Sequence, residues 1–289
     1  MSSNAESLNS LGNDLSDEGR WPDAEQAYIR ATEIDPSWSA PWYNLGLLYK
    51  QQRRWHDSIR ANQMAVDLDP SYRDAWWNLG IAATAIENWP LARAAWRGCG
   101  ISFPDGDGPI QAELGLVPIR LNPQGNGEVV WSHRIDPARA IIGNVPLPSS
   151  GYCEGDVVLH DGAATGHRKL DGRTVPVFDV LQRLTPSPRR TYEAWIEAAS
   201  SSDVAALTSM AESMNLQAED WTESMYSLCK ACSEGTPHEE HDSLESVAWV
   251  ARRHVGISAA DAETAIDMLE RWASAASDRA VLEVKQPPN

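Results

Sequence analysis

The sequence has few positive charges for its size. Its 289 residues include 24 lysines and arginines against 41 aspartates and glutamates, which gives a formal net charge of −17. Nucleic acid and anionic membranes attract basic proteins, so this acidic chain argues against either as its main target. The composition instead favours partners with basic or apolar surfaces.

Long apolar runs and cysteines are also scarce. No stretch approaches the roughly 18 consecutive apolar residues of a membrane-spanning helix, and MSSNAESLNS lacks a basic region followed by an apolar run. We therefore expect a cytoplasmic protein. Four cysteines are too few for a disulfide framework in a chain of this length. The hydrophobic fraction of 42%, with 13 tryptophans, is nevertheless too high for a disordered chain.

A period of 34 residues organises the first third of the chain. Four kinds of residue recur at this spacing, namely Leu11, Leu45 and Leu79; Gly12, Gly46 and Gly80; Trp21, Trp55 and Trp89; and Pro36, Pro70 and Pro104. The middle copy reads W-x2-L-G-x2-Y from Trp42 to Tyr49. This pattern resembles the tetratricopeptide repeat family, in which each repeat is a helical hairpin.

The physical properties of the pattern support the same fold. Apolar residues at helical spacing predict two short helices per repeat, each stable only if its apolar face is buried. Gly46 allows the paired helices to approach closely, and Pro70 ends the second helix. We predict an α-solenoid of three helical hairpins over residues 5–38, 39–72 and 73–106.

The resemblance also implies a binding surface. In the family the first helix of each repeat lines a concave groove, and the residues in that register are Asn9, Asn13, Tyr43, Asn44, Leu47, Lys50, Trp77, Asn78 and Ile81. The alternative for Tyr43, Leu47 and Trp77 is packing between helices. Some family members hold a terminal carboxylate with two asparagines and three basic residues. Asn13 and Asn44 match the two asparagines, but the three basic places hold Asn9, Asp74 and Asn78.

Residues 107–185 have a different period. Alternating apolar residues in PIRL, EVVWSHRI, RAIIGNV, DVVLHDG and TVPVFDVLQRL predict strands, separated by NPQGNG, PSSG, HDGAATG and LDG turns. We predict a small antiparallel β domain resembling a barrel. Cys153, His160 and Asp161 could form a hydrolytic site, but turns commonly carry such residues and no catalytic motif accompanies them.

Residues 190–289 are predicted to form an α+β domain. The order is strand 191–199, helix 201–215, a strand or strand pair 216–228, strand 243–253, a helix with Ser258 as its cap, and a closing strand 280–286. This β-α-β-β-α-β order is that of a ferredoxin-like fold.

A cysteine- and histidine-rich segment lies between the middle strands of this last domain. Cys229, Cys232, His238 and His241 have the spacing C-x2-C-x5-H-x2-H, and two thiolates with two imidazoles can form a closed tetrahedral zinc site. The histidine gap is shorter than the usual three to five residues, so this would be a loop site. Two alternatives remain open, a solvated acidic loop and a redox or metal-carrier pair.

Together these features predict a non-catalytic interaction protein that binds an apolar and basic protein or peptide segment. The alternatives are an enzyme or metallochaperone that uses Cys229 and Cys232, and an RNA-associated protein that uses the two C-terminal domains.

Overall fold

The computed structural model describes residues 2–125, 127–222 and 249–285. The described residues form two compact units, one within residues 1–112 and 136–138 and the other within residues 113–135 and 139–285. Below we call them the helical unit and the β unit. Within the described part of the chain, no helix is both long and apolar enough to cross a membrane.

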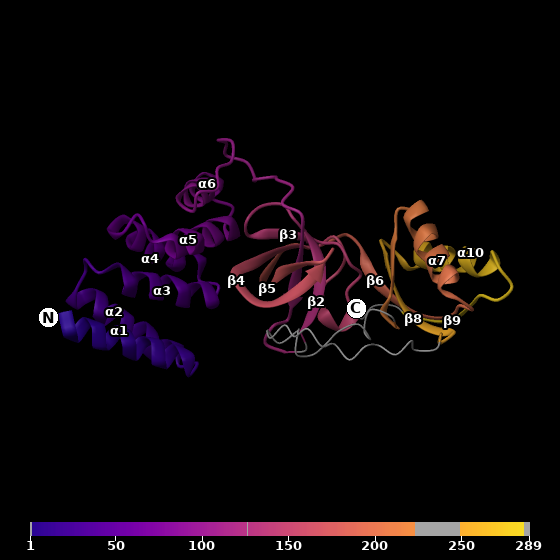
Figure 1. The fold of residues 1–289 in the computed structure, drawn as a ribbon, viewed down its shortest axis with the longest axis horizontal. Coiled ribbons are helices and arrows are strands. Elements are labelled where there is room, and N and C mark those ends of the chain that lie inside the picture. The colour runs from indigo at the N-terminus through magenta and orange to yellow at the C-terminus, as the bar shows by residue number, and fades with distance from the viewer. Residues whose placement is uncertain (1, 126, 223–248, 286–289) are drawn as a thin grey trace. The chain divides into compact units, whose positions relative to one another are not determined.

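The helical unit contains three successive helical hairpins (Figure 1). The helices are α1 (Ser2–Asp17), α2 (Trp21–Ile34), α3 (Ser39–Gln51), α4 (Trp55–Leu68), α5 (Arg73–Ala85) and α6 (Trp89–Gly98). The tight turns between paired helices also follow the 34-residue period, because Gly19, Arg53 and Glu87 all have positive φ. The predicted hairpins are therefore confirmed as helix pairs, although α6 ends at Gly98, well before Pro104.

Glycines set the distance between the two helices of each hairpin. A Cβ atom at Gly46 would lie 2.3 Å from the Asn62 amide, and one at Gly80 would lie 2.6 Å from the Trp96 ring. Gly12 has the same relation to Tyr28, at 2.4 Å. The prediction that Gly46 permits close approach is thus confirmed, and the partner is always the residue sixteen positions later.

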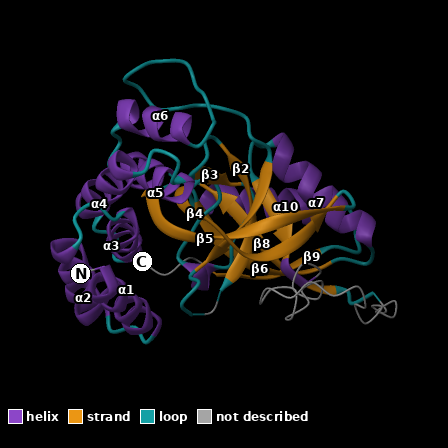
Figure 2. Cartoon of the chain, turned by 60° about the vertical axis from the view of Figure 1, so that its left-hand side comes forward, coloured by secondary structure: helices purple, strands orange, loops and turns teal. Residues whose placement is uncertain are grey.

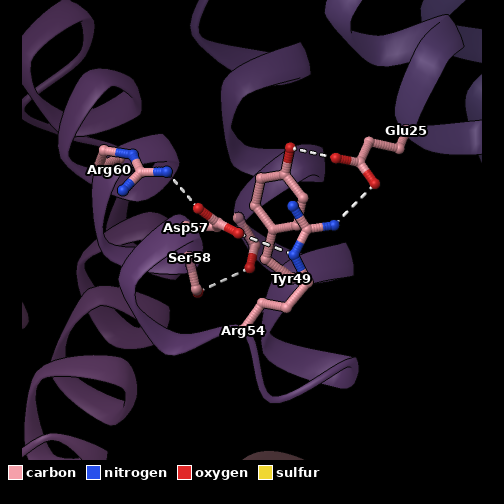
Figure 3. A network of polar contacts seen from close by, with 7 residues as sticks. Glu25, Tyr49, Arg54, Asp57, Ser58 and Arg60 are labelled. Atoms are coloured by element: carbon pink, nitrogen blue, oxygen red, sulfur yellow. Dashed lines mark hydrogen bonds and ion pairs between the residues drawn. The ribbon is translucent and has the colours of Figure 1, made fainter. Parts of the chain in front are cut away.

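A polar network joins the first hairpin to the second (Figure 3). Glu25 on α2 accepts hydrogen bonds from the Tyr49 hydroxyl at 2.9 Å and from Arg54 Nη1 at 2.8 Å. The Arg54 guanidinium lies 4.3 Å from the centre of the Tyr49 ring and also donates to Asp57 at 2.8 Å. Burial and the bond to Glu25 raise the pKa of Tyr49 to about 12, so its hydroxyl remains a donor at neutral pH.

The β unit begins with a closed five-stranded barrel. Its strands are β1 (Leu116–Leu121), β2 (Glu128–Arg134), β3 (Arg139–Ile142), β4 (Val157–Leu170) and β5 (Arg173–Thr185). Neighbouring strands are antiparallel except where β1 and β5 pair in parallel to close the barrel. The barrel core includes Ile119, Leu121, Ile142 and Val158, none of which is exposed.

One predicted turn in the barrel is wrong. Residues 160–166 were expected to separate two strands, but they lie inside β4, where the pairing with β5 shifts register. The irregularity accommodates Gly162, whose backbone N–H donates to the Asp161 carboxylate at 2.7 Å. The chain reverses at Asp171 and Gly172, within the predicted LDG turn, and both residues have positive φ as a two-residue hairpin turn of type I′ requires.

Among the described residues, a four-stranded sheet and two helices make up the rest of the β unit (Figure 2). Its elements are β6 (Arg190–Glu197), α7 (Ser201–Ser213), β7 (Gln217–Asp220), β8 (Arg252–Ala259), α10 (Ala262–Ser274) and β9 (Ala280–Lys285), and the strand order is β7-β8-β6-β9. Alternate residues of β6 and β8 pack with the helices in one core that includes Leu207, Met268, Leu269 and Trp272.

Two predicted boundaries in this region are also wrong. Residues 243–248 of the strand expected over 243–253 lie outside the described residues, and the strand that is described there, β8, continues to Ala259. Ser258 lies buried in β8 and does not cap a helix. Asp261 is the cap of α10 and accepts a hydrogen bond from Thr264 N at 2.8 Å. Glycine is uncommon inside strands, so Gly256 weakens the sequence signal for β8. Its missing side chain makes room for the Trp221 ring, which would lie 2.2 Å from a Cβ atom at this position.

Candidate functional site

The nine residues predicted to contact a partner lie on α1, α3 and α5, the first helices of the three hairpins. We call this set the first-helix face. Asn13 is exposed, and Tyr43, Asn44, Leu47 and Trp77 are partly exposed. Asn9, Lys50, Asn78 and Ile81 are buried, with exposed fractions of 9%, 3%, 5% and 0%. The accessible part of the predicted site is therefore the first group of five.

Three asparagines on this face are joined into one network. The Asn44 amide nitrogen on α3 donates to Asn9 Oδ1 at 2.8 Å and to Asn13 Oδ1 at 3.2 Å, both on α1. Since an amide nitrogen carries two hydrogens, both donors of Asn44 are used within the protein. Its carbonyl oxygen is left as the group that Asn44 can offer to a ligand.

A tyrosine that the sequence did not single out holds this network in place. The Tyr28 hydroxyl on α2 donates to Asn13 Oδ1 at 2.9 Å. Burial, and then the charge of Asp17, raise the pKa of Tyr28 to about 12, so the hydroxyl remains a donor. The signal that would have revealed Tyr28 is the period itself, because Asn62 and Trp96 follow at 34-residue intervals and contact the equivalent glycines.

Ring contacts fix the two partly exposed aromatic residues of the face. The Tyr43 ring lies 4.8 Å from the Tyr72 ring, and the Trp77 ring meets the Trp96 ring edge-on at 5.2 Å. Trp96 is fully buried. Tyr43 and Trp77 therefore have supported orientations while part of each side chain remains accessible, as suits an anchor for a partner.

The other predicted sites have different outcomes. Cys229, Cys232, His238 and His241 lie outside the residues that the structure describes. Within residues 2–125, 127–222 and 249–285, no group of three or more His, Cys, Asp or Glu side chains is placed to hold a metal ion.

The residues considered for a hydrolytic site, Cys153 and His160, lie in the β unit. His160 is fully buried, and its ring stacks on the Phe178 ring at a centroid distance of 5.3 Å. Burial, and then Asp156, raise the pKa of Cys153, which disfavours the reactive thiolate.

Solved structures with similar helices match about a third of the chain. The second and first TPR domains of Spaghetti (RPAP3), each bound to an HSP90 peptide, are 22% identical, with TM-scores of 0.33. They cover 34% of this chain and 91% and 79% of their own lengths. The TPR2B domain of yeast Sti1 is 19% identical, covers 33% of this chain and 77% of its own, and has a TM-score of 0.32.

Among the sequence comparisons, only those with family models found a match. No curated protein matches the chain at a significant level. Two family models match the helical unit, one described as TPR repeat over residues 3–52 and the other as tetratricopeptide repeat over residues 43–98. The matched residues span α1 to α6 and include every glycine contact that sets the hairpin spacing. Residues 3–98 are accordingly a tetratricopeptide repeat segment.

Proposed function

We propose that the protein is an adaptor whose first-helix face binds an extended segment of another protein. The observation that carries the proposal is the combination of Tyr43 and Trp77, partly exposed and supported by other rings, with a fixed amide network on adjacent helices. Aromatic anchors beside preformed polar groups are typical of binding hot spots. Such a surface binds tightly because little side-chain freedom remains to be lost.

The polar groups suit a peptide backbone better than a terminal carboxylate. Asn44 offers an acceptor, whereas Asn13 has its oxygen occupied twice and offers its amide hydrogens. Asn78 is only 5% exposed, and its amide has no hydrogen-bond partner among the residues that the structure describes. A peptide backbone also alternates donors and acceptors, so these groups can bind it without a net charge.

The charges favour a partner segment that is apolar and basic. The three places where a carboxylate-binding repeat would hold cations have Asn9, Asp74 and Asn78. Asp74 is exposed, and the chain as a whole has a net charge of −17. A cationic segment is attracted by this field, while an acidic chain end is repelled.

Peptide binding by the full-length chain tests this proposal. The probes are two pools of fluorescent octapeptides with equal apolar content, one basic with amidated ends and one acidic with a free C-terminal carboxylate. We expect the basic pool to bind at least about tenfold more tightly, and Tyr43→Ala with Trp77→Ala to weaken its binding by about tenfold or more. Trp21→Ala is the matched control, because Trp21 is 40% exposed but belongs to α2.

Two kinds of result would contradict this proposal. If neither pool binds, or if the double variant binds like wild type with unchanged circular dichroism, the first-helix face is not the binding site. If the acidic pool binds more tightly, the face binds peptides but our assignment of the partner's charge is wrong.

We also propose that Cys229, Cys232, His238 and His241 bind one structural zinc ion. The support is chemical, because two thiolates and two imidazoles at this spacing suit a closed zinc site. Thiolate ligands need a reducing compartment, which agrees with the cytoplasmic location that we propose for this protein.

We also propose a ferredoxin-like fold for residues 190–289. The support is the strand order β7-β8-β6-β9 in a sheet that shares its core with α7 and α10.

Elemental analysis of the purified protein checks the zinc proposal. We expect close to one zinc per chain for wild type, and loss of that metal in Cys229→Ser and Cys232→Ser. Cys153→Ser is the control, since Cys153 lies in the barrel portion of the β unit and should not affect the metal content. Wild-type protein with clearly less than one metal per chain, or cysteine variants that keep it, would exclude the site.

A further inference from the structure

One short loop of the β unit is held by carboxylates from two directions. Glu128 on β2 of the barrel accepts hydrogen bonds from the Leu147 backbone N–H, at 3.1 Å and 3.2 Å to its two oxygens. Glu219 on β7 of the sheet accepts from Val145 N and from the Asn144 amide, both at 3.0 Å. The loop 144–147 therefore connects the barrel to an edge strand of the sheet.

A tryptophan completes this junction. The Trp221 indole N–H donates to the Val145 carbonyl at 2.9 Å, and the side chain is 2% exposed. Asn144 is also anchored to the barrel, where its oxygen accepts from Trp131 N at 2.5 Å. Hydrogen bonds to this loop thus form one part of the contact between barrel and sheet, and the two carboxylates accept three of the loop's donors.

The negative charges of these two carboxylates are not compensated by nearby cations among the described residues. Neither Glu128 nor Glu219 forms an ion pair within the part of the chain that the structure describes. The carboxylate next along β7, Asp220, forms an ion pair with Arg253, which is therefore already engaged. On β8 the residue opposite Glu219 is Gly256, which adds no charge.

Their titration properties agree with that environment. Burial raises the pKa of Glu128 to about 7, and the charge of Glu219 adds to the effect, while the hydrogen bond from Leu147 opposes it. Burial likewise raises the pKa of Glu219, with Asp220 adding to the shift and the bonds from Asn144 and Val145 opposing it. Both carboxyl groups therefore bind a proton more tightly here than in water.

We propose that Glu128 and Glu219 form a proton-dependent clasp between the barrel and the sheet. While at least one of them is protonated, the loop 144–147 is held from both sides. When both ionise, two negative charges share one largely buried junction, with no cation paired to either of them among the described residues, and the contact loosens.

The direction of the pH dependence follows from the raised pKa values. A carboxyl group whose pKa is higher in the closed junction contributes stability that is complete below its ordinary pKa. That contribution is lost as the pH rises through the raised value. The junction should therefore be closed in mildly acidic solution and weaken from slightly acidic to slightly alkaline pH, with Glu128 titrating near pH 7.

Amide hydrogen exchange of the full chain measures this directly. The reporters are the backbone N–H groups of Val145 and Leu147, which donate to the two carboxylates. After correction for the intrinsic exchange rates, we expect their protection factors to fall about tenfold or more between about pH 5.5 and about pH 8.5. Protection that does not change with pH would overturn the proposal.

Matched variants separate this effect from general destabilisation. Glu128→Gln with Glu219→Gln cannot ionise, so protection should become nearly independent of pH. Glu154→Gln is the control, because Glu154 also lies between barrel and sheet but is bonded to Arg189 at 3.1 Å and Ser258 at 3.0 Å. Its pH dependence should match that of wild type. A double variant that keeps the wild-type slope contradicts the clasp.

A second measurement covers the case in which the double variant does not fold. Carbon-13 chemical shifts of the carboxyl groups in wild type give each midpoint of titration. Midpoints well above the ordinary glutamate value, about 4.3, support the clasp, and ordinary midpoints for both residues exclude it.

Discussion

The contacts that stabilise the helical unit differ from those that stabilise the β unit in how far apart their residues lie in the sequence. In the helical unit the closest packing contacts recur between residues sixteen apart, from Gly46 to Asn62 and from Gly80 to Trp96. In the β unit the indole of Trp272 donates to the carbonyl of Asp203, 69 residues earlier, at 2.8 Å. The Trp221 indole likewise reaches 76 residues back to Val145.

This difference determines how far the destabilising effect of a substitution extends through each unit. Contacts of short reach close small loops, so a repeat depends mainly on itself and its neighbours. Contacts of long reach tie distant segments into one cooperative structure, so one lost contact loosens all of them. The two units should therefore respond differently to equivalent substitutions.

The largest expected effect is that of removing a buried tryptophan. Trp272→Ala should destabilise the β unit by about 3–5 kcal/mol, because it removes a fully buried ring and leaves the Asp203 carbonyl without its donor. Hydrogen exchange measured segment by segment should show lost protection in β6, α7, β8 and α10 together. Trp96→Ala is the matched variant in the helical unit and should affect mainly α5 and α6. Loss of protection that begins at α1 in Trp96→Ala would contradict the comparison.

A smaller effect is expected from filling the space that a glycine leaves. Gly46→Ala places a methyl group where the Asn62 amide lies, and Gly256→Ala places one against the Trp221 ring. Each should lower the free energy of unfolding by about 1–3 kcal/mol, measured in urea. Gly108→Ala is the control, because no atom outside its chain neighbours lies within 4 Å of the added Cβ. Stability in Gly46→Ala equal to that of Gly108→Ala would show that the helices can separate without loss.

The smallest effect should come from the network between the first two hairpins (Figure 3). Tyr49→Phe removes the hydroxyl that donates to Glu25 but leaves the ring beneath Arg54. We expect a loss of about 0.5–1.5 kcal/mol in urea unfolding, since Arg54 still donates to Glu25. Protection in the β unit should not change. A loss there as large as in α2 and α3 would show that the two units unfold as one.

The sequence by itself determined the features that repeat or alternate locally. The 34-residue period located the helix pairs, because the glycines and prolines that space and end helices act within one hairpin. Alternating apolar residues located most barrel strands, and the Asp171–Gly172 turn was readable because both residues tolerate positive φ. For the candidate site, the period predicted which residues lie on the first helices.

Only the tertiary structure decided what depends on contacts between distant residues. Burial of Lys50 and Ile81 and the use of both Asn44 donors follow from neighbours that no local pattern reveals. Gly256 lies inside β8 because its missing side chain leaves room for the Trp221 ring, a contact that the local sequence does not reveal. The Glu128 and Glu219 pair likewise has no sequence signal, because its properties come from burial against one loop that both residues contact, although they are 91 positions apart in the numbering.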